Sequence, residues 1–592
     1  MSDDPRLLSS GLDIPTETYS DQPFVVQTDD GAWLCAVTTG AGHEGQSGQY
    51  VCTQRSLDRG VTWQDRVAVE SPTGPEASYA VMLKTPSGRV YVFYNYNTQN
   101  QREVIADPDT FKDGLCRRVD SLGDYVCKYS DDHGRTWSRQ RWVVPMRLFA
   151  IDRQNPYGGE VRFGWNVGKP FVIDGAVYLS FHKVGGFGRG FFTSSEGVLV
   201  RSDNLLTERD PERFVWETLP DGEIGLRTPP GGGPVSEEHS YVTLSDDTIY
   251  CVYRTTDGHP VCARSYDRGH TWTTPAWQCF GDGRRMKHPR AANFIWKCRN
   301  GKYLYWFHNH GGSCYEDRNP AWLCGGVEVD GPDGRTIAWS QPEIVLYDDD
   351  THIRMSYPDL IEMDDQLYIT ETQKDTARVH AIDPALLAGL WGQFDEHTPA
   401  PTGAVLELPG TTAMPERCEW PRLPEFAVRD GRRADFGTRP TRQGFSIDLT
   451  VQLAGATTTR AVLLDSRTPD GAGVCVAADR SRLEVSISDG RTENVWRSDA
   501  GALRADTRHR LTVVVDGGPH IILVVIDGLL YTGGAFKQFG WARFSPCLMH
   551  VHGEARASLA CSDHAVVSAL GVYARALRVS EAVALQCTPG GA

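Results

Sequence analysis

An eight-residue pattern, Ser-x-Asp-x-Gly-x-Thr-Trp, occurs three times in the chain. The copies span residues 56–63, 130–137 and 265–272, with five positions unchanged. Repetition of this kind constrains the architecture strongly, because each copy must serve the same part of a repeated unit. Ser and Asp side chains hydrogen-bond to nearby backbone, Gly allows a positive φ, and Trp fills the layer beneath a turn. Each octet is therefore predicted to be a hairpin turn between two strands, with a structural role.

Six pairs of apolar runs are separated by short turns that contain Asp, Asn or Gly, which is the signal of a β-hairpin. These runs begin at Pro23, Tyr79, Gly168, Ser240, Ala291 and Tyr357. Their spacing leaves room for two further strands in each unit, and the octets after the first, second and fourth hairpins supply such strands. The sequence therefore predicts an all-β protein with a six-bladed β-propeller. A single sandwich would not explain the shared register.

The pattern changes after residue 380. A short helix-like stretch and a Pro-rich run come first, and short strands at close spacing resume from Phe445. Such strands with polar turns are typical of a two-sheet β-sandwich, or jelly roll. The predicted domains are a propeller over residues 1–395, a linker that packs on the propeller over 396–440, and a β-sandwich over 441–592.

The net charge of −16 argues against a nucleic-acid or anionic-membrane partner. The first residues form no basic and apolar leader, and no run of 18 apolar residues is present, so we expect a cytoplasmic protein, or a secreted one if a leader has been removed. Fifteen Cys without a CxxC pair or zinc spacing favour reduced thiols. No cofactor is expected, although a structural Ca²⁺ in the propeller channel stays open, as does the oligomeric state.

The octet resembles the Asp box, or BNR repeat, of the sialidase superfamily, and all three copies match it fully. The resemblance implies a six-bladed propeller that houses a retaining glycosidase. The order of the C-terminal strands, the Val-Ile-Asp-Gly turn and the ending over residues 571–585 resemble a laminin-G or concanavalin-A-like domain. That second resemblance implies a module that binds carbohydrate or packs on the propeller.

In the sialidase superfamily, three Arg hold the substrate carboxylate, a Tyr activated by Glu is the nucleophile, and an Asp is the acid and base. The resemblance implies that Tyr357, at the start of the sixth hairpin, is the nucleophile. Arg254, Arg290 and Arg354 lie at the mouths of three successive blades and are candidates for the carboxylate clamp. The family's first Arg lies in an Arg-Ile-Pro motif, whereas this chain has Asp13-Ile14-Pro15. The resemblance thus leaves sialic acid, another acidic sugar and an uncharged sugar open.

The inner strand of each blade comes first in a propeller, so the strand ends of all blades are predicted to line one funnel. The catalytic candidates at these ends are Glu238, Tyr357, Glu371, His239 and His182. The candidates for substrate binding are Arg162, Trp165, Glu237, Arg254, His288, Arg290, His308, His310, Arg318 and Arg354. Glu316, on the same segment as Arg318, is also expected to contact substrate. Metal ligation by His182, His239 and His308 stays open in geometry, but no metal site is predicted, because no HxxxH pair supports it.

These residue types point to carbohydrate chemistry. Glu237 or Glu238 together with Glu371 could form the carboxylate pair of a glycosidase. The leading hypothesis is an exo-acting glycoside hydrolase that removes a terminal, acidic or neutral sugar from an oligo- or polysaccharide. Because His titrates near neutrality, the His-rich rim favours a second hypothesis, a lyase that acts on a uronate with His and Tyr as base and acid. A third is a non-catalytic propeller that binds glycans.

Overall fold

The computed structural model describes residues 4–395, 401–410, 414–435, 437–455, 460–534, 537–562 and 564–587. The chain divides into two compact units. One contains Leu8–Trp339 and Asp350–Pro384, and the other contains Met1–Leu7, Ser340–Asp349 and Ala385–Ala592. The α-helices in these ranges are α1 (Ala150–Arg153), α2 (Pro384–Gly392) and α3 (Val579–Ala584). Within the described residues, none is long and apolar enough to cross a membrane.

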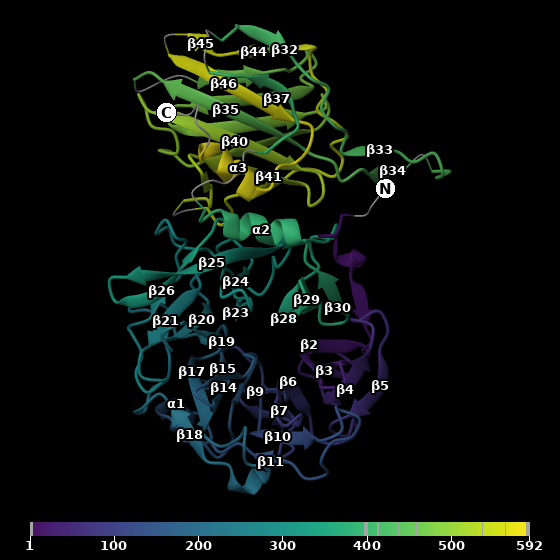
Figure 1. The fold of residues 1–592 in the computed structure, drawn as a ribbon, viewed down its shortest axis with the longest axis vertical. Coiled ribbons are helices and arrows are strands. Elements are labelled where there is room, and N and C mark those ends of the chain that lie inside the picture. The colour runs from purple at the N-terminus through teal and green to yellow at the C-terminus, as the bar shows by residue number, and fades with distance from the viewer. Residues whose placement is uncertain are drawn as a thin grey trace. The chain divides into compact units, whose positions relative to one another are not determined.

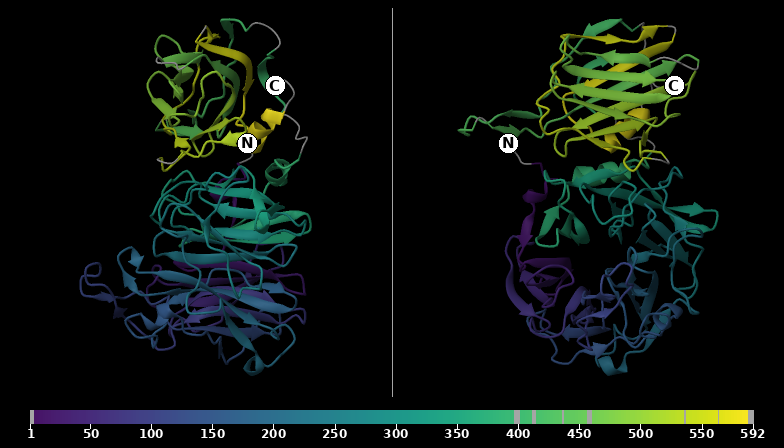
Figure 2. Two further views of the ribbon diagram at one scale, coloured as in Figure 1. Left: turned by 90° about the vertical axis from the view of Figure 1, so that its left-hand side faces the viewer. Right: turned by 180° about the vertical axis from the view of Figure 1, so that it is seen from behind.

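The first unit is a ring of six antiparallel sheets, which confirms the predicted six-bladed propeller (Figure 1). Seen from behind in Figure 2, the blades follow one another around the ring in chain order. Blades 1 and 2 are β2 (Tyr19–Gln27), β3 (Trp33–Gly40), β4 (Tyr50–Ser56) and β5 (Gln64–Ala68), then β6 (Ala77–Lys84), β7 (Val90–Tyr96), β10 (Asp124–Ser130) and β11 (Trp142–Val143). Blade 3 is β12 (Gly164–Trp165) and β13 (Phe171–Ile173) beside β14 (Ala176–Val184), β17 (Ser195–Ser202) and β18 (Trp216–Leu219).

The other three blades repeat this order. Blade 4 is β19 (Ser236–Thr243), β20 (Ile249–Thr255), β21 (Val261–Ser265) and β22 (Ala276–Trp277). Blade 5 is β23 (Phe294–Lys297), β24 (Tyr303–Phe307), β25 (Ala321–Gly331) and β26 (Gly334–Trp339). Blade 6 is β28 (Ser356–Met363), β29 (Gln366–Thr372), β30 (Ala377–Ala381) and β1 (Leu12–Ile14). All six predicted hairpins are thus the two inner strands of a blade. Two short hairpins, β8 (Val104–Ile105) with β9 (Leu115–Cys116) and β15 (Phe187–Gly188) with β16 (Phe191–Phe192), are insertions.

The N-terminal strand closes the ring. β1 pairs antiparallel with β30, so that Leu12 lies opposite Val379 and Ile14 opposite Ala377. The segment compared above with Arg-Ile-Pro is therefore the outer edge of the last blade. The first inner strand, β2, instead begins at Tyr19, and Asp21 lies near its start.

Adjacent blades pack face to face through apolar side chains. One buried cluster joins Leu34 and Val51 of blade 1 to Met82 and Val92 of blade 2. A second joins blade 3 to blade 4, and a third joins blade 6 to blade 1. The inner strands are buried on both faces, which explains their near-continuous apolar sequence.

The three octets fold as the predicted turns, each before the outermost strand of its blade. In the first copy, Thr62 N and Thr62 Oγ1 donate to the Asp58 carboxylate at 2.8 and 2.6 Å, and Gly60 N donates to Ser56 Oγ at 2.7 Å. The other copies repeat these bonds within about 0.1 Å of the same lengths. Gly60 has a φ of 86°, which explains the invariant Gly.

We expect Asp58→Ala to lower the thermal unfolding midpoint by about 1–3 °C at neutral pH. The hydrogen bond from the Thr62 hydroxyl, with the backbone bond from the same residue, lowers the pKa of Asp58. A carboxyl whose pKa is depressed by folding stabilises the protein above its unfolded pKa, about 3.9, and loses that contribution as the pH falls through the folded value. The difference in unfolding midpoint between Asp58→Ala and wild type, measured at a series of pH values, is therefore expected to shrink below about pH 4. Leu57→Ala, a 68% exposed side chain of the same turn, is the control, and a gap that does not depend on pH would contradict the assignment.

The second unit contains a sandwich of two antiparallel sheets. One follows the order β31 (Ala404–Leu408), β46 (Ala565–Tyr573), β35 (Phe445–Leu453), β40 (Arg508–Asp516), β41 (Ile521–Ile526) and β42 (Leu529–Leu530), with β43 (Ala542–Arg543) and β45 (Cys561–Ser562) at its sides. The other follows β32 (Arg417–Glu419), β44 (Arg556–Leu559), β36 (Arg460–Asp465), β37 (Gly473–Asp479), β38 (Arg482–Ser488) and β39 (Glu493–Arg497). One buried cluster of apolar side chains fills the space between them. Outside the two sheets, this unit also holds β27 (Glu343–Leu346), β33 (Ala427–Arg429) and β34 (Thr438–Pro440).

The segment expected to be a linker over 396–440 contributes strands to the sandwich. β31 pairs with β46, and β32 pairs with β44, so each sheet takes one strand from it. The sequence did not predict these strands, because a Pro-rich run is typical of a connection. Pro is nevertheless tolerated beside short strands at the edge of a sheet. Residues 396–400 lie outside the described residues. The cysteines whose side chains the structure describes are free thiols.

Candidate active site

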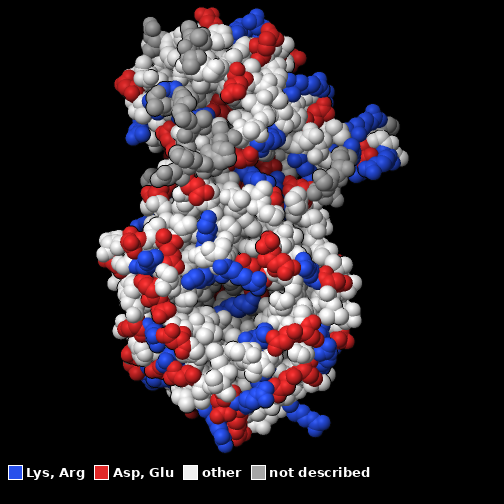
Figure 3. Space-filling model, viewed as in Figure 1, with Lys and Arg blue, Asp and Glu red and all other residues white. Residues whose placement is uncertain are grey.

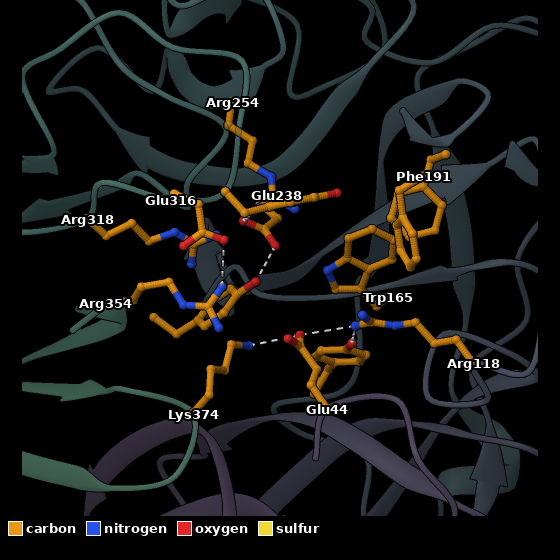
Figure 4. A pocket seen from close by; sticks show the side chains of 14 residues that line it. Glu44, Arg118, Trp165, Phe191, Glu238, Arg254, Glu316, Arg318, Arg354 and Lys374 are labelled. Carbon is orange, nitrogen blue, oxygen red and sulfur yellow. Dashed lines mark hydrogen bonds and ion pairs between the residues drawn. The ribbon is translucent and has the colours of Figure 1, made fainter. Parts of the chain in front are cut away.

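A pocket opens within the propeller unit at the ends of the inner strands. It is lined by Glu44, Tyr79, Arg118, Trp165, Phe191, Phe192, Glu238, Arg254, Tyr315, Glu316, Arg318, Arg354, Tyr357 and Lys374. These residues come from all six blades and their connections, and ten of them are labelled in Figure 4. Five are cationic and three are acidic. The space-filling view in Figure 3 shows a hollow in the propeller with Lys and Arg gathered at its rim.

A repeated irregularity of the inner strands directs side chains into the funnel. β2, β6, β19 and β28 each contain a β-bulge near their first residues. The bulged residues Gln22, Tyr79, Glu238 and Tyr357 have φ between 46° and 61°. Non-glycine residues hold this conformation only where the surrounding structure enforces it, and such positions concentrate at functional sites. Three of these four residues line the pocket.

Tyr357 and Glu238 form a buried pair at the base of the pocket. Tyr357 Oη donates to Glu238 Oε1 at 2.6 Å, and both residues are at most 4% exposed. Burial raises the pKa of Glu238, and the nearby charge of Glu237 adds to the shift while Arg254 opposes it. Burial also raises the pKa of Tyr357 well above its usual value, and the charge of Glu238 acts in the same direction. The pair can therefore share one proton between the Tyr357 phenol and the Glu238 carboxylate, whose raised pKa makes it a stronger base.

A second layer of ion pairs fixes Glu238 from behind. Arg254 contacts Glu238 Oε2 at 2.7 Å and Glu237 Oε2 at 2.9 Å. Glu237 in turn receives Arg290 NH2 at 2.8 Å. All four side chains are buried, so their charges are compensated within the group. Glu237 and Arg290 therefore position Arg254 and Glu238 without lining the pocket.

Two further arginines face the pocket, and little negative charge lies close to them. Arg318 is 4% exposed and donates from NH1 to Ser356 Oγ at 2.6 Å, while its Nε has no hydrogen-bond partner among the described residues. Burial lowers the pKa of Arg318, and the charges of Arg254 and Arg354 add to this effect. Among the described residues, the ion pair of Arg354 is a long contact of 3.8 Å to Glu316. A bound anion would supply the missing negative charge.

On the other side of the pocket, a chain of charges crosses from blade 6 to blade 2. Lys374 Nζ lies 2.8 Å from Asp21 Oδ2 and 3.0 Å from Glu44 Oε1. Glu44 also contacts Arg118 NH2 at 3.0 Å, so that it lies between two cations in Figure 4. Burial alone would raise the pKa of Glu44, but Lys374 and then Arg118 outweigh burial and lower it. Glu44 is therefore ionised near neutral pH.

Aromatic rings form a wall beside these charges. The Trp165 ring lies 5.0 Å from the ring of Phe192 and 6.0 Å from the ring of Tyr79. Phe191 and Phe192 come from the inserted strand β16, and Arg290 lies over the ring of Tyr315 at 4.6 Å. Aromatic faces beside charged groups are suited to stacking a sugar ring while polar groups bind its substituents.

The structure brings together seven of the residues predicted from the sequence. Those that line the pocket are Trp165, Glu238, Arg254, Glu316, Arg318, Arg354 and Tyr357. Glu237 and Arg290 lie directly behind them. Arg162 instead lies near Asp124 at 3.5 Å, with a third of its side chain exposed. Glu371 accepts from Gln373 Nε2 at 2.5 Å and lies 3.3 Å from His380 Nε2, so it does not face Glu238 across the pocket.

None of the five predicted histidines lines the pocket. His182 packs behind Trp165 at 3.9 Å between ring centroids, and His239 stacks on Tyr253 at 4.3 Å. His288 and His308 stack on each other, and His310 lies 2.6 Å from the backbone oxygen of Asp317. Burial lowers the pKa of each of these imidazoles. Within the pocket as described, no histidine is therefore placed as an acid or base.

Seven pocket residues were not predicted from the sequence. They are Glu44, Tyr79, Arg118, Phe191, Phe192, Tyr315 and Lys374. Only Tyr79 carried a usable signal, since it begins the second hairpin just as Tyr357 begins the sixth. Among the described residues, no group of three or more His, Cys, Asp and Glu side chains is placed to hold a metal ion.

No family model matches the sequence, and no curated protein matches it. Solved structures similar to the chain include the Trypanosoma rangeli sialidase in complex with 2,3-difluorosialic acid, at 13% identity over 98% of this chain and 96% of that chain, with a TM-score of 0.43. The intramolecular trans-sialidase of Ruminococcus gnavus is similar at 14% identity over 63% of this chain and 96% of that chain, with a TM-score of 0.43. The leech intramolecular trans-sialidase is similar at 13% identity over 64% of this chain and 70% of that chain, with a TM-score of 0.44. At these identities and TM-scores, the likenesses assign no activity to this chain.

Proposed function

We propose that the protein is an exo-acting glycoside hydrolase that removes a terminal acidic sugar from a glycan with retention of configuration. The observation that carries the proposal is the hydrogen bond of 2.6 Å between Tyr357 and Glu238, both of which line the pocket. A buried phenol next to a carboxylate of raised pKa is an activated nucleophile of the kind that covalent catalysis needs.

In the first step, Tyr357 Oη attacks the anomeric carbon while Glu238 takes the phenolic proton. The bond between the anomeric carbon and the glycosidic oxygen breaks, and that oxygen leaves with a proton from an acid or from water. In the second step, water attacks the anomeric carbon of the glycosyl–tyrosine and gives a proton to the group that protonated the leaving oxygen in the first step, and Glu238 returns its proton to the departing Tyr357 oxygen. Two displacements at one carbon retain its configuration.

Two carboxylates of the pocket remain to protonate the departing oxygen, Glu44 and Glu316. Glu44 is held ionised between Lys374 and Arg118, whereas the Glu316 side chain is 68% exposed at the rim. A general acid matters for a poor leaving group and is dispensable for a good one. The rates of Glu44→Gln and Glu316→Gln are therefore compared on glycans and on aryl glycosides. The variant that lacks the general acid is expected to be slow on glycans but close to the wild-type rate on aryl glycosides.

The cations support an acidic sugar. Arg318 and Arg354 both face the pocket, and the Nε of Arg318 has no acceptor among the described residues. A carboxylate could accept from both guanidinium groups and relieve the buried charge of Arg318. This arrangement supports a carboxylate-bearing sugar over a neutral one.

We expect Arg318→Ala to raise KM for an acidic aryl glycoside by roughly 10- to 100-fold, the range of a charge-assisted hydrogen bond of about 1.5–3 kcal/mol. The loss is expected to be much smaller for Arg318→Lys, which keeps the charge. Steady-state kinetics on matched acidic and neutral glycosides measure the effect. Equal losses on both substrates would contradict a role for Arg318 in binding the carboxylate.

The lyase hypothesis has less support from the geometry, because none of the five predicted histidines lines the pocket. A glycan panel tests the proposal against both alternatives. The hydrolase releases a reducing sugar from an acidic substrate, a lyase forms an unsaturated product, and a binding protein releases nothing. Either of the last two outcomes would overturn the proposed function.

A further inference from the structure

Lys374 reaches the pocket from a strained turn after β29. Its φ is 80°, a conformation that a non-glycine residue rarely adopts. The turn is held on both sides, because Lys374 N donates to Thr372 Oγ1 at 2.9 Å and Lys374 O accepts from Ser20 N at 3.0 Å. Strain of this kind persists where the surrounding structure enforces it, and it directs the ammonium into the pocket.

The ammonium of Lys374 is fixed over the ring of Tyr357. Two carboxylates hold it, with Nζ 2.8 Å from Asp21 and 3.0 Å from Glu44, and Nζ lies 4.1 Å from the centroid of the Tyr357 ring. A cation within about 6 Å of an aromatic face is attracted to it. Both carboxylates offset part of the charge of the ammonium, and Glu44 is also shared with Arg118.

We propose that Lys374 stabilises the tyrosinate form of Tyr357 through the face of its ring, and so lowers the barrier to both displacement steps. This inference rests on the proposed function, in which Tyr357 is the nucleophile. A phenolate ring carries more negative charge than a phenol ring, so the attraction of the ammonium grows as Glu238 takes the proton. An interaction that strengthens only on the way to the transition state raises kcat and not substrate affinity.

Other groups around Tyr357 explain why such a cation is needed. Besides burial, the charges of Glu238, Asp21 and Glu44 each raise the pKa of Tyr357. Arg254 lowers it, but Arg254 also pairs with Glu237 and Glu238. Arg318 donates to Ser356. Lys374 therefore supplies positive charge at the ring face, where it does not compete with Glu238 for the phenolic hydrogen bond.

The test compares Lys374→Met, Lys374→Arg and wild type in pre-steady-state kinetics with an aryl glycoside of an acidic sugar. We expect Lys374→Met to lower the rate constant of aryl release by roughly 30-fold with little change in KM, which is about 2 kcal/mol at 1.36 kcal/mol per tenfold. Lys374→Arg, which keeps a cation, is expected to recover much of the rate. Lys169→Met is the matched control, since Lys169 also pairs with a buried carboxylate, Asp359, at 2.8 Å but lies outside the pocket.

The effect of Lys374→Met on the rate could arise from the contact of Lys374 with Glu44 and not from its contact with Tyr357. The Glu44→Gln background separates these two explanations. We expect the loss caused by Lys374→Met to persist in the Glu44→Gln background, because the cation acts on the ring. A rate in Lys374→Met equal to wild type, a loss confined to KM, or a loss that disappears in the Glu44→Gln background would overturn the inference. If Lys374→Met does not fold, Lys374→Arg and Lys374→Gln are compared instead. Equal rates of aryl release in these two variants would contradict a role for the positive charge of Lys374. No turnover by wild type would instead remove the proposed function.

Discussion

Replacing Tyr357 with Phe is expected to reduce kcat by about 10³-fold or more, because the variant lacks the oxygen that would bond to the sugar. The Tyr357 hydroxyl makes its hydrogen bond to Glu238, which keeps Arg254 as a partner in the variant. The protein is therefore expected to fold and to bind the acidic glycoside nearly as before. Initial rates and KM on the best substrate of the panel measure both quantities.

Tyr303→Phe is the matched control for this experiment. Tyr303 Oη donates to Glu328 Oε1 at 2.6 Å, the same length as in the Tyr357 pair, but on the strands of blade 5 outside the pocket. Its removal tests the cost of losing a partly buried phenol–carboxylate bond alone. A Tyr357→Phe variant with more than a tenth of wild-type kcat would show that Tyr357 is not the nucleophile.

Glu238→Gln is expected to reduce kcat/KM by about 10²- to 10⁴-fold, the usual contribution of a positioned general base. The amide keeps the shape of the carboxylate but takes no proton from Tyr357. In wild type, kcat/KM is expected to rise with pH as Glu238 ionises, and because burial raises the pKa of Glu238, this acidic limb should lie above the usual range of Glu. The limb should be absent from the pH profile of the variant.

Glu328→Gln controls for the loss of a carboxylate that accepts from a tyrosine. A Glu238→Gln variant that keeps the acidic limb of the wild-type profile would assign the limb, and the base, to another group. Glu44 is the alternative that such a result would favour, because its carboxylate also lines the pocket.

Much of the propeller could be predicted from the sequence, because its signals are local. The octet over residues 56–63 contains every hydrogen-bonding group of its own turn, and the hairpin from Tyr79 carries both strands and the turn between them. The division near residue 340 could not be predicted in this way. Residues 340–349 and 404–408 belong to the second unit because of contacts with residues far away in the sequence. No periodic pattern in the sequence indicates such contacts.

The site was predictable only where it follows the strand register. Tyr357 and Glu238 begin inner strands, and β-bulges then aim them into the funnel. His182 and Glu371 also lie near strand ends, but the alternation of side chains along a strand directs them between neighbouring strands and rings. Glu44, Arg118 and Lys374 come from connections, where no period relates sequence position to direction.

A covalent adduct on Tyr357 would test the central claim most directly. A fluorinated acidic glycosyl fluoride slows the second displacement, so that the glycosyl–enzyme accumulates and can be digested and mapped by mass spectrometry. We predict one added sugar per chain, located on Tyr357 and absent from Tyr357→Phe. An adduct on another residue, or turnover of an acidic glycoside with inverted configuration, would contradict nucleophilic catalysis by Tyr357.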